Sequence, residues 1–346
     1  MLLWSSSGVI KKLFISILLA LTLSLTMMGL TWQYFLQTPL AITHPMFYTI
    51  KPGQTLSSVS ADLKTLHVVN HPRYFLMLAK LKYGEQYIQA GTYELTSGMT
   101  VTQLLEKFMT GDMVRFKWRI GEGWTFVQIA AQMHQEQLWE EVVLPLSQAE
   151  MLKDLGRHES SLEGLLFPDT YYFLANSTDA TFLKRAMEKM DKILAQEWAE
   201  RALNLPYKTP YDALIAASIV EKETGVDAER TKVAGVIVRR LQKGMPLQAD
   251  PTVIYGLGAA YKNALTKADL VNDTPYNTYT RRGLPPTPIA TVSLASLHAA
   301  LHPDQGDTLY FVADGSGGHT FSSTLNQHVL AVAKYRAQES NKDKKQ

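Results

Sequence analysis

The chain of 346 residues is long enough for a sizeable core and for two domains. Its hydrophobic content of 46% and charged content of 19% are those of a globular protein with an additional apolar segment. The net charge of +2 is too small to indicate nucleic-acid binding, and the absence of cysteine excludes disulfides, thiolate metal sites, cysteine nucleophiles and a lipidated N-terminal cysteine.

An uncharged apolar run of 23 residues, 13–35, follows a pair of lysines near the N-terminus. As a helix it measures about 35 Å, enough to cross a bilayer, and Trp32, Tyr34 and Phe35 stand where interfacial aromatic residues occur. Because the next lysine or arginine is Lys51, we expect a single-pass anchor with residues 1–12 in the cytoplasm and the rest of the chain across the membrane. A cleaved signal peptide is the alternative, which the length of the run and the lack of an A-x-A site disfavour.

Residues 47–118 are predicted to form a small α/β domain. One short pattern begins at each of Gly53, Gly98 and Gly123. It consists of a glycine, a spacer, a threonine that can cap a helix, and then apolar residues. Any strand–turn–helix unit produces this pattern, but residues 48–59 also resemble the opening of LysM repeats, which bind peptidoglycan and chitin. Strands are expected at residues 47–50, 91–95 and 113–120.

Residues 119–337 are predicted to form a larger, mainly helical domain with a few strands. Three of its loops combine aromatic side chains with neutral hydrogen-bonding groups on a proline-stiffened backbone, which suits a sugar, although their Asp and Asn residues can equally cap turns. These three loops are residues 162–172, 247–256 and 274–289. Helices are expected at residues 126–137, 181–203, 211–224 and 227–241, and a strand at 308–313.

Two other features of this region indicate no special chemistry. His319 and His328 lack a third ligand at a suitable spacing, so no metal or cofactor is expected. The charged tail, residues 338–346, has no apolar side chains and is expected to be disordered.

The helix expected at residues 211–224 carries the leading candidate for catalysis. Glu221 follows the almost wholly apolar segment 213–220 and shares a helical face with apolar residues. A carboxyl held against such a face is partly desolvated, which would raise its pKa and keep a proton available for general acid catalysis. A surface glutamate in the last helical turn is the alternative. Glu223 points about 160° away from Glu221, and the apolar packing favours Glu221.

Several motifs stand in a fixed order along the chain, at residues 120–125, 162–171, 217–224, 248–256, 274–279, 283–286, 309–313 and 317–322. In this order they resemble the endolytic murein transglycosylases, the YceG-like family. Together with the apolar run and the LysM-like segment, the resemblance covers nearly the whole chain. Two departures from the usual motifs, Thr287 and the pair Gln327 and His328, concern loop detail and leave the candidate carboxyl untouched.

The resemblance implies an α+β protein and a function. The expected activity is that of a lyase in the bacterial inner membrane, with its catalytic part in the periplasm. It would cut the β-1,4 bond between N-acetylmuramic acid and N-acetylglucosamine within peptidoglycan strands, leave 1,6-anhydro ends and terminate nascent strands. Association with peptidoglycan synthases is also implied. A membrane-tethered peptidoglycan-binding scaffold without activity and a hydrolytic muramidase are the alternatives.

The resemblance also implies site residues. Glu221 matches the first Glu of the family's Ser-Ile-Val-Glu-Lys-Glu motif, the catalytic one, which would protonate the leaving oxygen and then deprotonate the sugar 6-hydroxyl. Gln248, Asp250, Tyr276 and Asn277, in the matching loops, are expected to orient the glycan or to support this carboxyl.

Overall fold

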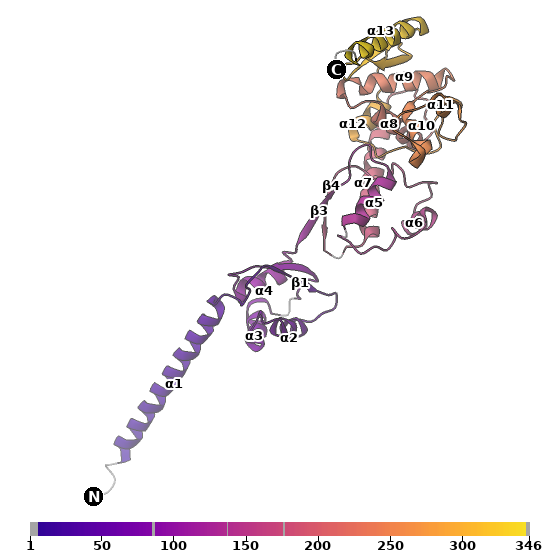
Figure 1. The fold of residues 1–346 in the computed structure, drawn as a ribbon. Coiled ribbons are helices and arrows are strands. Elements are labelled where there is room, and N and C mark those ends of the chain that lie inside the picture. Colours follow the sequence, from indigo (N-terminus) through magenta and orange to yellow (C-terminus); the bar gives the residue numbers. More distant parts are fainter. Residues whose placement is uncertain (1–5, 85–86, 137, 176, 344–346) are drawn as a thin grey trace. The chain divides into compact units, whose positions relative to one another are not determined.

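The computed structural model describes residues 6–84, 87–136, 138–175 and 177–343. Helices and short strands alternate along the chain, which confirms the mixed helix and strand class (Figure 1). The chain divides into two compact units, Met1–Phe116 with Leu174–Asn176, and Lys117–Phe173 with Ser177–Gln346. The predicted boundary between residues 118 and 119 lies inside strand β3 (Arg115–Arg119).

The apolar run forms most of helix α1 (Ser6–Gln37), of which Lys11–Gln37 is long and apolar enough to cross a membrane. Its mean hydropathy is 2.3, and none of its most apolar window is buried. Of the three aromatic residues expected at the interface, Tyr34 is exposed, whereas the rings of Trp32 and Phe35 pack against Tyr74, at centroid distances of 6.1 and 5.4 Å. Aromatic side chains bury large areas, so this end of α1 also belongs to the core of the first unit.

The rest of the first unit is a small α/β body. Its elements are β1 (Met46–Ile50), α2 (Leu56–Thr65), α3 (Pro72–Tyr83), β2 (Gly91–Leu95) and α4 (Val101–Thr110). β1 and β2 pair antiparallel, with Met46 opposite Leu95 and Ile50 opposite Gly91. The core of this unit includes Phe75 and Phe108, which are fully buried.

The repeated glycine and threonine pattern is confirmed as a turn followed by a helix cap. Gly53, Gly98 and Gly123 all have positive φ, from 67° to 82°, a conformation that glycine adopts without strain. At each of these three turns, the hydroxyl of the threonine two residues after the glycine accepts a hydrogen bond from the backbone N–H three residues further on, at 3.2 to 3.3 Å.

The second unit contains most of β3 and of β4 (Thr170–Leu174). Its other helices and strands are α5 (Phe126–Glu136), α6 (Gln148–Asp154), α7 (Asp179–Ala199), α8 (Pro210–Glu223), α9 (Arg230–Gln242), α10 (Asp250–Leu257), α11 (Lys267–Val271), α12 (Leu294–Leu301), β5 (Tyr310–Ala313), β6 (His319–Ser322) and α13 (Leu325–Asp343). β3 pairs with β4 and β5 with β6. All four predicted helices are present, with ends within a few residues of those expected.

Helix α8 is the centre of this unit. Every residue from Ala213 to Val220 is buried, and α8 packs against α7, α9, α10 and α12 (Figure 1). A helix that is apolar on all sides needs such a surrounding layer. The polar residues that follow Val220 therefore emerge where the packing of α8 ends.

Residues 338–343, which were expected to be disordered, continue α13 to Asp343. Extending an established helix costs little free energy, and most residues of this segment have moderate to good helix propensity. Residues 344–346 lie outside the described part of the chain.

Candidate active site

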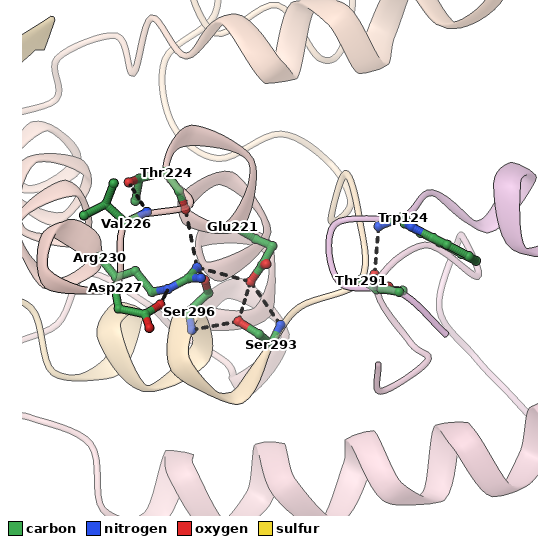
Figure 2. Close-up of polar contacts among 10 residues, drawn as sticks. Trp124, Glu221, Thr224, Val226, Asp227, Arg230, Thr291, Ser293 and Ser296 are labelled. Carbon is green, nitrogen blue, oxygen red and sulfur yellow. Dashed lines mark hydrogen bonds and ion pairs between the residues drawn. The ribbon is translucent and has the colours of Figure 1, made fainter. Parts of the chain in front are cut away.

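Glu221 lies at the end of the buried part of α8, with its side chain only 6% exposed. Its Oε2 accepts the backbone N–H of Ser293 at 3.1 Å and the Ser293 hydroxyl at 2.5 Å (Figure 2). Arg230 Nη1 lies 3.6 Å from the same oxygen. The two groups of Ser293 are hydrogen-bond donors to this oxygen, and Arg230 is its ion-pair partner.

The neighbours of Glu221 form a network that fixes the start of α12. Ser293 is the N-cap of α12, since its hydroxyl accepts the N–H of Ser296 at 3.2 Å. Arg230 donates to the Ser296 hydroxyl at 2.6 Å and to the carbonyl of Thr224 at 3.4 Å (Figure 2). Glu221 therefore makes the contacts of a structural carboxylate that joins α8, α9 and α12.

Glu223, two residues further on, has a different environment. The side chain is half-buried, and burial raises the pKa of its carboxyl to about 8, with the nearby Asp250 carboxylate raising it further and the Arg240 guanidinium opposing both. Within the described residues this carboxyl makes no hydrogen bond. Below about pH 8 the Glu223 carboxyl is therefore protonated, and its O–H donates no hydrogen bond to a described residue.

Two loops with predicted substrate-binding residues meet at Glu223. Arg240 Nη1 donates to the Leu247 carbonyl at 2.7 Å and lies 3.4 Å from Gln248 Oε1. Gln248 and Asp250 are both exposed, and the Tyr279 hydroxyl donates to Asp250. The structure therefore brings two of the four predicted residues to the same exposed region, beside Glu223 instead of Glu221.

The backbone at Gln248 supports a functional role for this loop. Gln248 has a φ of 50°, in the left-handed region that a residue with a side chain adopts at a cost of about 1–2 kcal/mol. Its N–H donates to the Thr278 carbonyl at 3.1 Å, and the next N–H, of Ala249, donates to the Thr278 hydroxyl at 3.0 Å. Strain held by surrounding contacts is common at binding sites.

The other two predicted residues, Tyr276 and Asn277, make different contacts. Tyr276 is half-buried, its hydroxyl is 2.9 Å from that of Thr287, and its ring lies 4.8 Å from that of Tyr255. Asn277 is fully buried, and its amide donates to three carbonyls, of which that of Asn272 is nearest at 2.7 Å. The expectation that Asn277 orients the glycan is therefore unsupported: it holds the end of α11, the capping role that its residue type also allows.

A second carboxyl with a raised pKa lies in the predicted loop 162–172. Glu163 is only 2% exposed and accepts the N–H of Phe126 at 3.0 and 3.1 Å and the hydroxyl of Tyr255 at 3.2 Å. Burial raises the pKa of Glu163 to about 7, against the lowering effect of these donors and of Lys222. It is enclosed by α5, α8 and α10 and is not exposed to a polymer.

Glu163 should make stability fall as pH rises. Its pKa is about 7 in the folded chain and near 4.5 unfolded, so its stabilising contribution is complete below about pH 4.5 and is lost as pH rises through 7, by roughly 3 kcal/mol. We expect the melting temperature of Glu163→Gln to vary less between pH 4.5 and 8 than that of the wild type. Glu188→Gln, at an exposed position, is the control. Equal pH dependence in Glu163→Gln and the wild type would contradict this role.

Histidines give one geometrically possible cation site among the described residues. Glu197, His298 and His302 place ligand atoms within 4.8 Å of one another. Existing contacts already occupy these groups, since His298 Nδ1 lies 2.8 Å from Glu197 Oε2 and His302 Nε2 lies 2.9 Å from the Glu200 carbonyl. His319 pairs instead with Glu229, at 2.7 Å.

The YceG-like family model matches residues 48–334 of this chain. The chain belongs to the YceG-like family. The family predicted from the motifs is thus confirmed.

Individual relatives agree with this membership. An endolytic murein transglycosylase of Bacillus subtilis (strain 168) is 33% identical over 310 residues, which cover 85% of this chain and 85% of that protein. One of Streptococcus pneumoniae serotype 2 is 30% identical and covers 88% of this chain but 61% of the streptococcal protein. The crystal structure of a yceG-like protein from Listeria monocytogenes is 32% identical, with a TM-score of 0.52, and covers 82% of this chain and 98% of that one.

Proposed function

We propose that this member of the YceG-like family is an endolytic murein transglycosylase. It would act as a lyase on the bond between N-acetylmuramic acid and N-acetylglucosamine within peptidoglycan strands and leave 1,6-anhydro ends. Two relatives that bear this name support the reaction class. The observation that carries the proposal is the half-buried Glu223, protonated up to about pH 8, beside the exposed Gln248 and Asp250.

In this mechanism Glu223 takes the role that the motif had suggested for Glu221. Most glycosidases use two carboxyls, but a lytic transglycosylase needs one, because the 6-hydroxyl of the substrate replaces water. Glu223 donates its proton to the leaving oxygen while positive charge builds at the sugar C1. The resulting carboxylate then takes the proton of the 6-hydroxyl as that oxygen closes the anhydro ring.

Arg240 and Asp250 fit the two halves of this cycle. Asp250 opposes a second negative charge nearby and so favours the protonated acid before the reaction. The Arg240 cation favours the carboxylate that remains after the first proton transfer. Gln248 and Asp250, both exposed, are suited to hold the hydroxyl and amide groups of the sugar.

The apolar helix supports the proposed location. Its exposed side chains, Leu13 to Leu30, have nothing to cover them in the described part of the chain, and a lipid bilayer would do so. We infer a single-pass anchor in the inner membrane, with the N-terminus in the cytoplasm and both units in the periplasm. Glycan binding by the LysM-like segment, termination of nascent strands and association with peptidoglycan synthases are parts of the same proposal.

Product analysis tests the function. The full-length chain in detergent is incubated with purified peptidoglycan, and the soluble products are analysed by mass spectrometry. We expect products 18 mass units lighter than hydrolytic ones per cut, because no water is added. Reducing ends would indicate a muramidase, and binding to peptidoglycan without any new ends would indicate a scaffold. Either result would refute the proposed reaction.

A further inference from the structure

A cavity of about 680 Å³ lies in the second unit, and its lining does not include Glu223. Its walls come from β3, the loop at residues 121–124, α5 and the first residue of β4. The charged, aromatic and amide side chains in its lining are Lys117, Arg119, Glu122, Trp124, Gln132 and Glu136. Its lining includes part of the family motif at residues 120–125, to which the proposed mechanism assigns no role.

The cavity holds charges of both signs that do not neutralise each other. Lys117, Arg119, Glu122 and Glu136 are all exposed, and in the described part of the chain none of them takes part in an ion pair. Elsewhere in this unit nearby opposite charges do pair, as Arg157 does with Glu159 at 2.6 Å. Two cations and two carboxylates around one hollow are available to a ligand that carries both charges.

Trp124 gives the cavity a fixed aromatic wall. Its ring lies so close over Gly121 that a Cβ atom there would be 2.3 Å from the ring. Its backbone is held by Thr291, whose hydroxyl accepts the Trp124 N–H at 3.0 Å and whose N–H donates to the Trp124 carbonyl at 2.8 Å (Figure 2). A ring anchored in this way is ordered before a ligand arrives, which lowers the entropic cost of binding.

The same loop connects the cavity to the helix that carries Glu223. Lys222 Nζ donates to the carbonyl of Gly123 at 3.1 Å. A Cβ atom at Gly123 would lie 3.8 Å from Cγ of Glu221. One wall of the cavity therefore touches the last turn of α8.

We propose that this cavity binds the stem peptide of a peptidoglycan strand, an inference that rests on the proposed function. The sugar rings of the strand are uncharged, so four charged side chains give them no complement. A stem peptide carries free carboxylates, which Lys117 and Arg119 match, and before cross-linking a free amine, which Glu122 and Glu136 match. Trp124 packs on the apolar part of the peptide.

The test compares two substrates. Peptidoglycan with its stem peptides and glycan strands stripped of them by an amidase are incubated with the full-length chain in detergent, and anhydro ends are counted. We expect Lys117→Ala with Arg119→Ala to lower kcat/KM about tenfold on stem-bearing strands and to change it less than twofold on stripped strands. Lys184→Ala with Lys192→Ala, which removes two exposed charges from α7, should change neither rate.

A direct binding measurement completes the test. Titration of a soluble tetrapeptide stem into the wild type should show saturable binding that the Lys117→Ala, Arg119→Ala variant loses. An equal loss of rate on both substrates, no loss on either, or unchanged peptide binding would overturn the inference while the proposed function stands. A wild type that produces anhydro ends from neither substrate would instead refute the proposed function.

Discussion

Glu223→Gln is expected to lower the release of anhydro products by about 10²- to 10⁴-fold, the usual contribution of a general acid. Glutamine has nearly the same shape but carries no acidic proton that it could transfer to the leaving oxygen. Glu223 makes no hydrogen bond with the described residues, so the change breaks none. The melting temperature at neutral pH should therefore stay close to that of the wild type, because a neutral amide replaces a carboxyl that is already protonated below about pH 8. Product release and thermal melting are measured on the full-length chain in detergent.

Glu221→Gln is the matched control, with the opposite pattern expected. Removing the charge leaves Arg230 with Asp227 as its ion-pair partner and weakens the contacts of Glu221 with Ser293, the N-cap of α12, at a cost on the order of 1 kcal/mol. Turnover per folded molecule should stay within about tenfold of the wild type. If Glu221→Gln remains folded but loses all turnover while Glu223→Gln retains it, Glu221 is the general acid and our assignment is wrong.

The local features of this fold could be predicted from the sequence because neighbouring residues determine them. The threonine caps after Gly53, Gly98 and Gly123 require only a turn and a hydroxyl at the right spacing. The central position of α8 follows from an apolar segment that has no polar face to expose. The helical end of α13 escaped prediction, because composition alone does not reveal that a helix already under way continues.

The candidate site was harder to predict, because its character depends on residues that are distant in the sequence. An apolar run before Glu221 predicts burial, and Glu221 is buried, but sequence periodicity does not show that Arg230 and Ser293 meet it. In the same way, the residues that neighbour Glu223 in the sequence do not indicate that Asp250 and Arg240 lie close to it in the fold. The helical angle between the two glutamates was a usable signal, but which face meets the substrate loops depends on the tertiary structure.

The pH dependence of the reaction gives a second large effect, through Arg240. The acid must be protonated, so activity is expected to fall as pH rises through the pKa of Glu223, about 8. Arg240 lowers that pKa, because its cation favours the carboxylate. Arg240→Met should therefore move the alkaline limb of the rate profile upward, by about one pH unit for the loss of one nearby charge. Initial rates of anhydro-product release between pH 6 and 10 measure this shift.

Two further variants separate the charge of Arg240 from its hydrogen bonds. Arg240→Lys keeps the cation but loses the fork that holds the Leu247 and Leu309 carbonyls at 2.7 Å, so the rate should fall while the alkaline limb stays near pH 8. Arg239→Met removes a neighbouring guanidinium that binds Asp304 and should leave the limb in place. A merely structural Arg240 would lower the rate in both of its variants without moving the limb. An upward shift in Arg240→Met alone would show that this cation acts on the acid itself, and through it on both proton transfers.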